Sequence, residues 1–179
     1  MRRSFAFVLS TLVLAACADA APPTDGGSSP PQPSPEVDEE RLGVYSALIT
    51  ELSGAESGDW DRVYVVTDLC DDAAEPSSPK GCEDSLSAVE QDALREGLSI
   101  DGLRFVDDPT PIYEHEGWFE GRPSEIVLRL GPIVEHDGEV RVGASYGCGG
   151  LCGSGTTYVL ERRGQEWKVV GQRGMMWIA

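Results

Sequence analysis

Five cysteines stand out among the 179 residues, because cysteine has the widest choice of chemistry in this chain. A cysteine can carry a lipid, form a disulfide, bind a metal or act as a redox thiol. Cys17 ends an apolar run near the start, which leaves an even number for pairing. We favour the two local pairs, Cys70 with Cys82 and Cys148 with Cys152, over the long-range pairings. Pairing is expected because the chain is predicted to be exported to an oxidising compartment, where disulfides persist.

The segment from Gly147 to Gly155 places Cys148 and Cys152 among five glycines. Redox-active thiols usually have two residues between them at a helix amino terminus, whereas these two have three residues between them in a glycine-rich turn. A structural bridge is therefore favoured over a thiol oxidoreductase, and export disfavours a zinc site built from the four cysteines. The stretch from Tyr146 to Trp177 resembles a pattern in uncharacterised secreted bacterial proteins, and that resemblance implies no activity.

The two histidines are the candidates for acid–base chemistry. His115 lies between Glu114 and Glu116, and His136 precedes an Asp-Gly turn. A general base needs a recess and a nearby carboxylate, but with 31 acidic residues in the chain such a neighbour is expected by chance. We therefore expect surface positions for both histidines. His115 is the better catalytic candidate, and an enzyme with an acid–base pocket around it is an alternative function.

Acidic residues crowd around the first predicted disulfide, and carboxylates are the ligands that calcium prefers. Their spacing does not match an EF-hand loop, and prolines interrupt it. A solvated acidic loop is therefore favoured over a metal site, and no metal or other cofactor is expected. The residues concerned are Asp68, Asp71, Asp72 and Glu75.

The overall charge restricts the classes of partner. The chain has 31 acidic and 14 basic side chains, a formal net charge of -17, and no basic run beyond its first residues. This excludes nucleic-acid binding through a basic face and argues against a polybasic membrane surface. An acidic surface attracts cationic partners, such as a basic protein. We therefore favour a binding or scaffolding role without catalysis.

The amino-terminal residues predict an export signal. Arg2 and Arg3 precede an uncharged stretch, residues 5–16, which as a helix would span only about 18 Å of a hydrocarbon core about 30 Å thick. The stretch ends in Leu14-Ala15-Ala16-Cys17, which resembles a bacterial lipobox. In that family the cysteine thiol receives a diacylglyceryl group, the signal is cut before it, and the new amino terminus is usually acylated. The resemblance implies a lipoprotein of the cell envelope, anchored on the outer side of the cytoplasmic membrane or at the outer membrane.

The composition predicts three regions. Residues 1–16 are the signal peptide, residues 17–36 are the lipidated cysteine and a disordered linker rich in Pro, Gly and Ser, and residues 37–179 are one folded domain. The linker cannot bury enough apolar surface to offset its ordering entropy. The domain has enough apolar residues for a core, since 40% of the chain is hydrophobic.

Within the domain, hydrophobic spacing predicts two helices and then a series of strands. One helix begins at Ser34-Pro35 and ends near Ser53, and a second begins at a capping box on Ser87 and ends near Leu98. Residues 63–69 form a strand buried on both faces, and residues 103–106 form a short strand.

The last third of the chain predicts an antiparallel β-meander. Strands are expected at residues 126–130, 133–134, 140–142, 158–160 and 167–170, with an edge strand at 175–178. Asp137-Gly138 and the residues around Gly164 are the hairpin turns. Trp118-Phe119 are expected in the core, and an exposed aromatic contact is the alternative. We therefore expect an α+β fold in which two helices pack on this meander. The order of elements resembles cystatin-like and nuclear-transport-factor-like folds, which host many functions.

Overall fold

The computed structural model describes residues 38–54, 60–76, 80–114, 118, 124–150 and 152–178. The predicted signal peptide, the lipobox cysteine Cys17, the linker, His115 and Phe119 lie outside these residues. The described residues of the domain show an α+β fold, as the sequence predicts.

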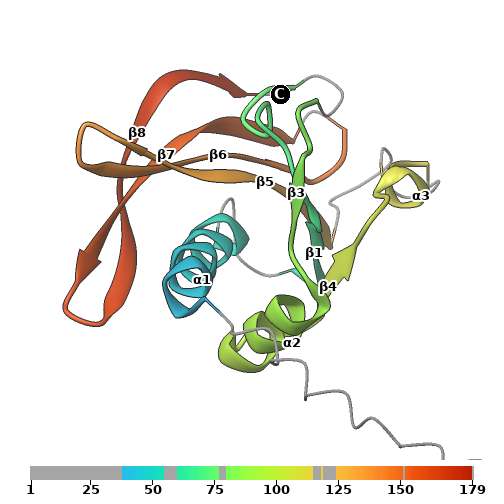
Figure 1. Ribbon diagram of the computed structural model, residues 1–179. Coiled ribbons are helices and arrows are strands. Elements are labelled where there is room, and N and C mark those ends of the chain that lie inside the picture. The colour runs from blue at the N-terminus through green and yellow to red at the C-terminus, as the bar shows by residue number, and fades with distance from the viewer. Residues whose placement is uncertain are drawn as a thin grey trace, which may run out of the picture. The chain divides into compact units, whose positions relative to one another are not determined.

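A six-stranded sheet forms the body of the domain, with the strand order β4-β1-β5-β6-β7-β8 (Figure 1). Two short strands pair separately, and three helices complete the described elements. The helices are α1 (Glu39–Ser53), α2 (Ala88–Gly97) and α3 (Thr110–Tyr113). The strands are β1 (Arg62–Val66), β2 (Asp68–Leu69), β3 (Asp84–Ser85), β4 (Leu103–Val106), β5 (Glu125–His136), β6 (Glu139–Gly147), β7 (Gly153–Arg163) and β8 (Glu166–Ile178).

The sheet is mixed, because two strands that precede the predicted antiparallel meander join it in parallel. Strands β5 to β8 are antiparallel as predicted, but β1 pairs in parallel with both β4 and β5. Parallel neighbours require long crossover connections, and residues 67–102 and 107–124 provide them. Strand β1 is buried on both faces, as predicted and as is typical of parallel strands. The predicted single strand breaks at Thr67, beyond which β2 pairs with β3.

Helix α1 covers one face of the sheet. Its first described turn is capped by Asp38, whose carboxylate accepts hydrogen bonds from the backbone N–H groups of Glu40 (3.0 Å) and Arg41 (3.1 Å). The expected cap at Ser34 is thus corrected, because Asp38 is the side chain that reaches the free N–H groups. The helix contacts β5 and β8, and the hydroxyl of Tyr45 donates to the carbonyl of Gly131 at 3.1 Å. Its buried residues are Val44, Tyr45, Leu48, Ile49 and Leu52.

Helix α2 lies beside α1 and contacts strand β4. The predicted capping box is confirmed: Ser87 Oγ accepts from the N–H of Glu90, whose carboxylate accepts from the N–H of Ser87 at 2.8 Å. Only Leu94 of this helix is fully buried. Arg41 of α1 forms ion pairs with both neighbouring elements: its guanidinium lies 2.6 Å from Asp84 of β3 and 2.7 Å from Glu90 of α2.

The two predicted hairpins are confirmed. Asp137 and Gly138 join β5 to β6 with positive φ angles of 53° and 78°, the conformation that a two-residue type I′ turn needs. Gly164, with φ 72°, lies in the turn between β7 and β8. Residues 175–178 are not a separate edge strand, because β8 continues without a break to Ile178 and itself forms the sheet edge.

Candidate ligand-binding site

Alternate residues of the central strands supply two separate apolar clusters, one on each face of the sheet. The face under α1, here called the α1 face, includes Val63 and Val65 of β1. The opposite face, here called the cavity face, includes Tyr64 and Val66 of the same strand, with Val127 of β5 and Trp118. Trp118 is 7% exposed, so the prediction that it belongs to the core is confirmed.

A cavity of about 580 Å³ opens on the cavity face. This volume lies within the range of small-molecule sites. Its floor comes from buried residues of three strands, its walls from half-buried aromatic residues, and its rim from exposed carboxylates. The floor contains Val66, Val127 and Ser145, the walls contain Tyr113, Tyr146 and Trp177, and the rim contains Asp68, Glu75, Asp107 and Asp108.

The first disulfide loop forms one side of the cavity. Cys70 is bonded to Cys82 with a Cα–Cα distance of 4.0 Å, and Cys70 itself lines the cavity. The backbone N–H of Cys70 donates to the carbonyl of Leu130 at 3.2 Å, which fixes the loop to the sheet. The indole Nε1 of Trp177 donates to the carbonyl of Ala74 at 2.6 Å, so the end of β8 holds the same loop.

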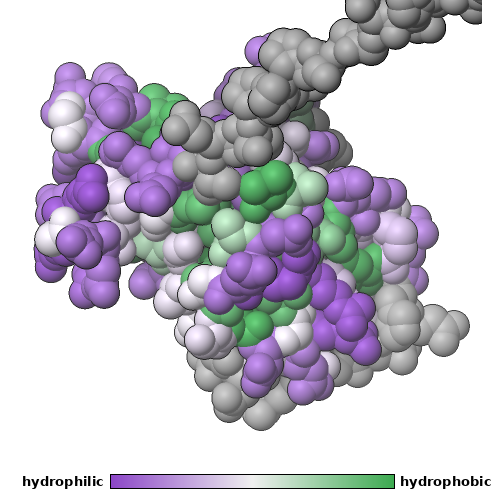
Figure 2. All heavy atoms as spheres, turned by 60° about the horizontal axis from the view of Figure 1, so that its bottom comes forward, coloured by the Kyte–Doolittle hydropathy of each residue, from purple (hydrophilic) through white to green (hydrophobic). Residues whose placement is uncertain are grey.

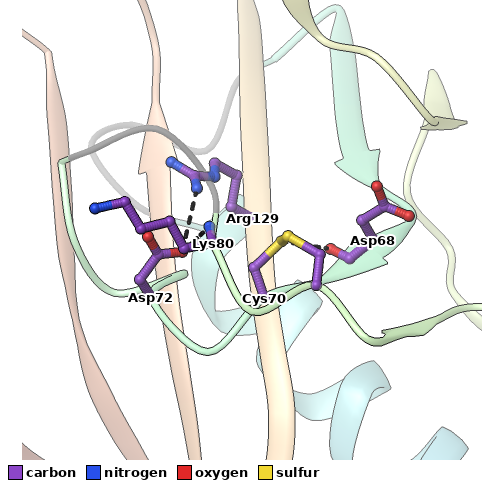
Figure 3. The surroundings of a disulfide bond; sticks show 6 residues. Asp68, Cys70, Asp72, Lys80 and Arg129 are labelled. Carbon is purple, nitrogen blue, oxygen red and sulfur yellow. Dashed lines mark hydrogen bonds and ion pairs between the residues drawn. A yellow bond between two sulfur atoms is a disulfide. The ribbon is translucent and has the colours of Figure 1, made fainter.

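A hydrogen bond and an ion pair of Asp72 fix the loop on its other side (Figure 3). Asp72 accepts a hydrogen bond from the backbone N–H of Lys80 at 2.9 Å and lies 3.9 Å from the guanidinium of Arg129. Figure 3 places Asp68 on the opposite side of Cys70 from this group. The charge of Arg129 is therefore offset by Asp72, while Asp68 contributes its charge to the rim.

The structure explains why a glycine is present at position 155, after the second cysteine pair. A Cβ atom at this position would clash with Nε1 of Trp177 and with the carbonyl oxygen of Ala74. Glycine is therefore needed for the tryptophan and the disulfide loop to reach the sheet together. The second pair itself, Cys148–Cys152, joins the ends of β6 and β7 with a Cα–Cα distance of 5.1 Å.

The opposite side of the cavity comes from the residues between β4 and α3. The hydroxyl of Thr67 donates to Asp107 at 2.7 Å, and Asp108 accepts from the N–H of Thr110 at 2.9 Å. Hydrogen bonds from Thr110 lower the pKa of Asp108, so this carboxylate stays charged to a lower pH. Tyr113 packs edge-on against Trp118, with ring centroids 5.3 Å apart. Burial raises the pKa of Tyr113, and the charge of Arg129 opposes that rise.

The four rim carboxylates form no ion pair with any residue that the structure describes. Most described basic residues pair instead with other acids, so no ion pair with a described residue offsets the charge of the rim. The paired cations are Arg41, Arg62, Arg95, Arg129, Arg141, Arg163, Lys168 and Arg173.

A second hollow, of about 830 Å³, lies between α1 and the β7–β8 hairpin. Figure 2 shows this side of the molecule, where small apolar patches are separated by polar side chains. Its lining includes Ala47, Trp167 and an ion pair between Glu166 and Lys168 at 3.4 Å. Because these opposite charges offset one another, the first cavity offers the stronger electrostatic selection.

The structure separates the residues that the sequence suggested for metal binding. Asp68 and Glu75 line the cavity, while Asp72 is engaged by the loop and Arg129. Within the described ranges, no group of three or more His, Cys, Asp or Glu side chains is placed to hold a metal ion, and Asp71 belongs to no such group.

The remaining predicted site residues are placed as follows. The disulfide pairs Cys70–Cys82 and Cys148–Cys152 agree with the local pairing expected from the sequence. His136 is exposed, as expected, and lies 3.2 Å from the neighbouring Asp137. The surface position expected for His115 stays a prediction, and its catalytic role stays an alternative, because that residue is outside the described ranges.

Sequence reasoning missed the residues that complete the cavity. Asp107 and Asp108 precede Pro109 and Thr110, a pattern of acids before a helix start that could have drawn attention to them. Trp177 carried no such signal. Its contact with Ala74 joins residues 103 positions apart and depends on the complete sheet.

Comparisons with protein-family models, curated proteins and solved structures found no match to this chain. Among the described residues, no helix has the length and apolar character needed to cross a bilayer.

Proposed function

We propose that the protein is a lipid-anchored binding protein of the cell envelope, and that the cavity is its binding site for a cationic partner. The observation that carries this proposal is a rim of four carboxylates that form no ion pair with a described residue, Asp68, Glu75, Asp107 and Asp108, around a partly apolar floor. A low-dielectric recess lined by one sign of charge concentrates ligands of the opposite sign. The net charge of -17 acts in the same direction over a longer range.

The location is proposed from two features. Two disulfides in one domain are typical of proteins in oxidising compartments. The Leu14-Ala15-Ala16-Cys17 sequence supplies the attachment point, and two or three acyl chains hold a protein on a bilayer durably. We also propose, from the order of the elements alone, that the fold is similar to cystatin-like and nuclear-transport-factor-like folds.

The anchor is tested by metabolic labelling with a fatty acid. We expect label in the wild-type protein and none in the Cys17→Ser variant, because only a thiol can form the thioether. Equal labelling of the two proteins would refute the lipobox interpretation.

The binding role is tested with a strongly basic protein, a lysozyme, titrated into the full-length protein in non-ionic detergent. The test variant is Asp68→Asn with Glu75→Gln, since neither side chain forms a hydrogen bond or ion pair with a described residue. The control is Glu96→Gln with Glu135→Gln, which removes the same charge from exposed positions outside the cavity. We expect weaker binding in the cavity variant alone. No binding at low salt, or equal loss in both variants, would contradict the proposal.

A further inference from the structure

We infer that the ligand group held by the cavity is an alkylammonium, a positively charged nitrogen carried on a short apolar chain. This inference rests on the proposed function and names its chemical class. Three properties of the cavity lead to it: the charge of the rim, the apolar character of the floor and the aromatic walls.

The rim selects a cation over an anion or a neutral group. Four carboxylates face one basic residue in the lining, Arg129, and that residue is offset by Asp72. The rim side chains are exposed, so a bound nitrogen keeps part of its hydration while it interacts with them. A strongly hydrated ammonium is suited to such a partly solvated position.

The floor selects an organic cation over an inorganic one. Val66 and Val127 are 5% and 1% exposed, and they lie beneath the charged rim. An inorganic ion would gain nothing from this surface, whereas each methylene of an alkyl chain buried there should raise affinity about fourfold. The ligand chain should therefore point to the floor and its nitrogen to the rim.

The aromatic walls favour a cation between these two levels. Tyr113 and Trp177 both line the cavity, and each is held in place by another contact. Tyr113 packs against Trp118, and Trp177 is hydrogen-bonded to Ala74. Aromatic rings fixed near a binding site attract ammonium groups through their negative faces. Because the rings are already positioned, little conformational entropy is lost on binding.

The test is calorimetric titration of the full-length protein, in detergent at low salt, with methyl-, propyl- and pentylammonium. We expect affinity to rise along this series by about fourfold per methylene. Asp68→Asn with Glu75→Gln should weaken pentylammonium binding about tenfold, whereas Glu96→Gln with Glu135→Gln should leave it unchanged.

The same titration distinguishes a free amine from a lysine side chain of a partner. A short peptide with blocked ends and one internal lysine is compared with pentylammonium. Tighter binding of the peptide indicates a polypeptide partner, and tighter binding of pentylammonium indicates a free amine. Both results support the inference.

The inference and the proposed function can fail separately. An affinity that does not change with chain length, or an equal loss in the cavity and control variants, overturns the alkylammonium inference. If the basic protein still binds and Asp68→Asn with Glu75→Gln still weakens it, the proposed function stands without the inference. If neither the basic protein nor any ammonium binds, both are wrong.

Discussion

The two faces of the sheet are built by different means. On the α1 face, a helix of 15 residues buries Tyr45, Leu48 and Ile49 completely. On the cavity face, a disulfide loop, a four-residue helix and one tryptophan from β8 surround an open cavity. Burial of apolar surface is the main source of folding free energy, whereas a disulfide holds a polar loop in place even when the loop buries little apolar surface. The comparison shows that the packed helix core lies on one face, while the other face carries the cavity that we propose as the binding site.

The charges follow the same division. Near α1, Arg41 lies within ion-pair distance of Asp84 and Glu90. At the cavity, Asp68 and Glu75 have no such partner among the described residues. Carboxylates without a cationic partner repel one another and do not stabilise the fold, and their position around a recess is therefore the basis of the proposed binding role.

The largest effect is expected from the α1 face. Ile49→Ala should lower the free energy of unfolding by about 2–5 kcal/mol, because it leaves a cavity in a fully buried position. Urea unfolding followed by circular dichroism measures this loss. Pentylammonium affinity of the folded fraction should stay unchanged, and a loss of affinity equal to that of the cavity variant would mean that the faces are not independent.

The next largest effect is expected from the first disulfide. Replacing Cys70 and Cys82 together by serine should cost about 3 kcal/mol of unfolding free energy, from the entropy of the closed loop. Pentylammonium binding should weaken as well, because this loop forms one side of the cavity. Denaturation and calorimetry on the same preparation measure the two effects.

The second disulfide is the matched control for that experiment. Its shorter loop predicts a loss of about 2 kcal/mol when Cys148 and Cys152 are both replaced by serine. Neither cysteine lines the cavity, so binding should be retained. If both double variants lose binding equally, the first loop has no special role at the cavity.

Sequence reasoning succeeds where a feature depends on residues that are close together in the chain. The capping box of Ser87 and Glu90 and the turn at Asp137-Gly138 were predicted correctly, because each depends on residues within a few positions of one another. The local disulfides were predicted for the same reason.

The rest depends on contacts between distant residues. The parallel pairing of β1 with β4 places Val63 opposite Leu103, and no local pattern encodes that register. The cavity likewise needs Trp177 and Ala74, which meet only when β8 has joined the sheet. Half of the candidate metal residues, Asp68 and Glu75, lie at the cavity, but the acidic pattern alone did not distinguish them from Asp71 and Asp72.

A smaller effect is expected where Trp177 holds the loop. Trp177→Phe keeps most of the apolar ring but removes the hydrogen bond to Ala74, and should lower unfolding free energy by about 1 kcal/mol. Trp167→Phe on the opposite side of the sheet is the control, because the indole of Trp167 donates no hydrogen bond to a described residue. Equal losses in urea unfolding would show that ring size, and not the hydrogen bond, is what matters.

The smallest effect is expected from the ion pair on the α1 side. Arg41 lowers the pKa of Asp84 in the folded protein, so this pair stabilises above the unfolded pKa and the stabilisation is lost as pH falls through the folded pKa. Because the Asp84 side chain is 46% exposed, solvent screening limits the loss in Asp84→Asn to about 1 kcal/mol at most, at pH 7. Urea unfolding at pH 7 and pH 3 checks this, and a difference between variant and wild type that grows in acid would contradict it.

Hydrogen–deuterium exchange of the full-length protein, with and without a bound lysozyme, tests most directly whether the cavity face is the binding face. We predict slower exchange in residues 66–76 and 107–113, which surround the cavity, and unchanged exchange in α1 and α2. Slower exchange confined to residues 39–53 and 88–97 would contradict the account.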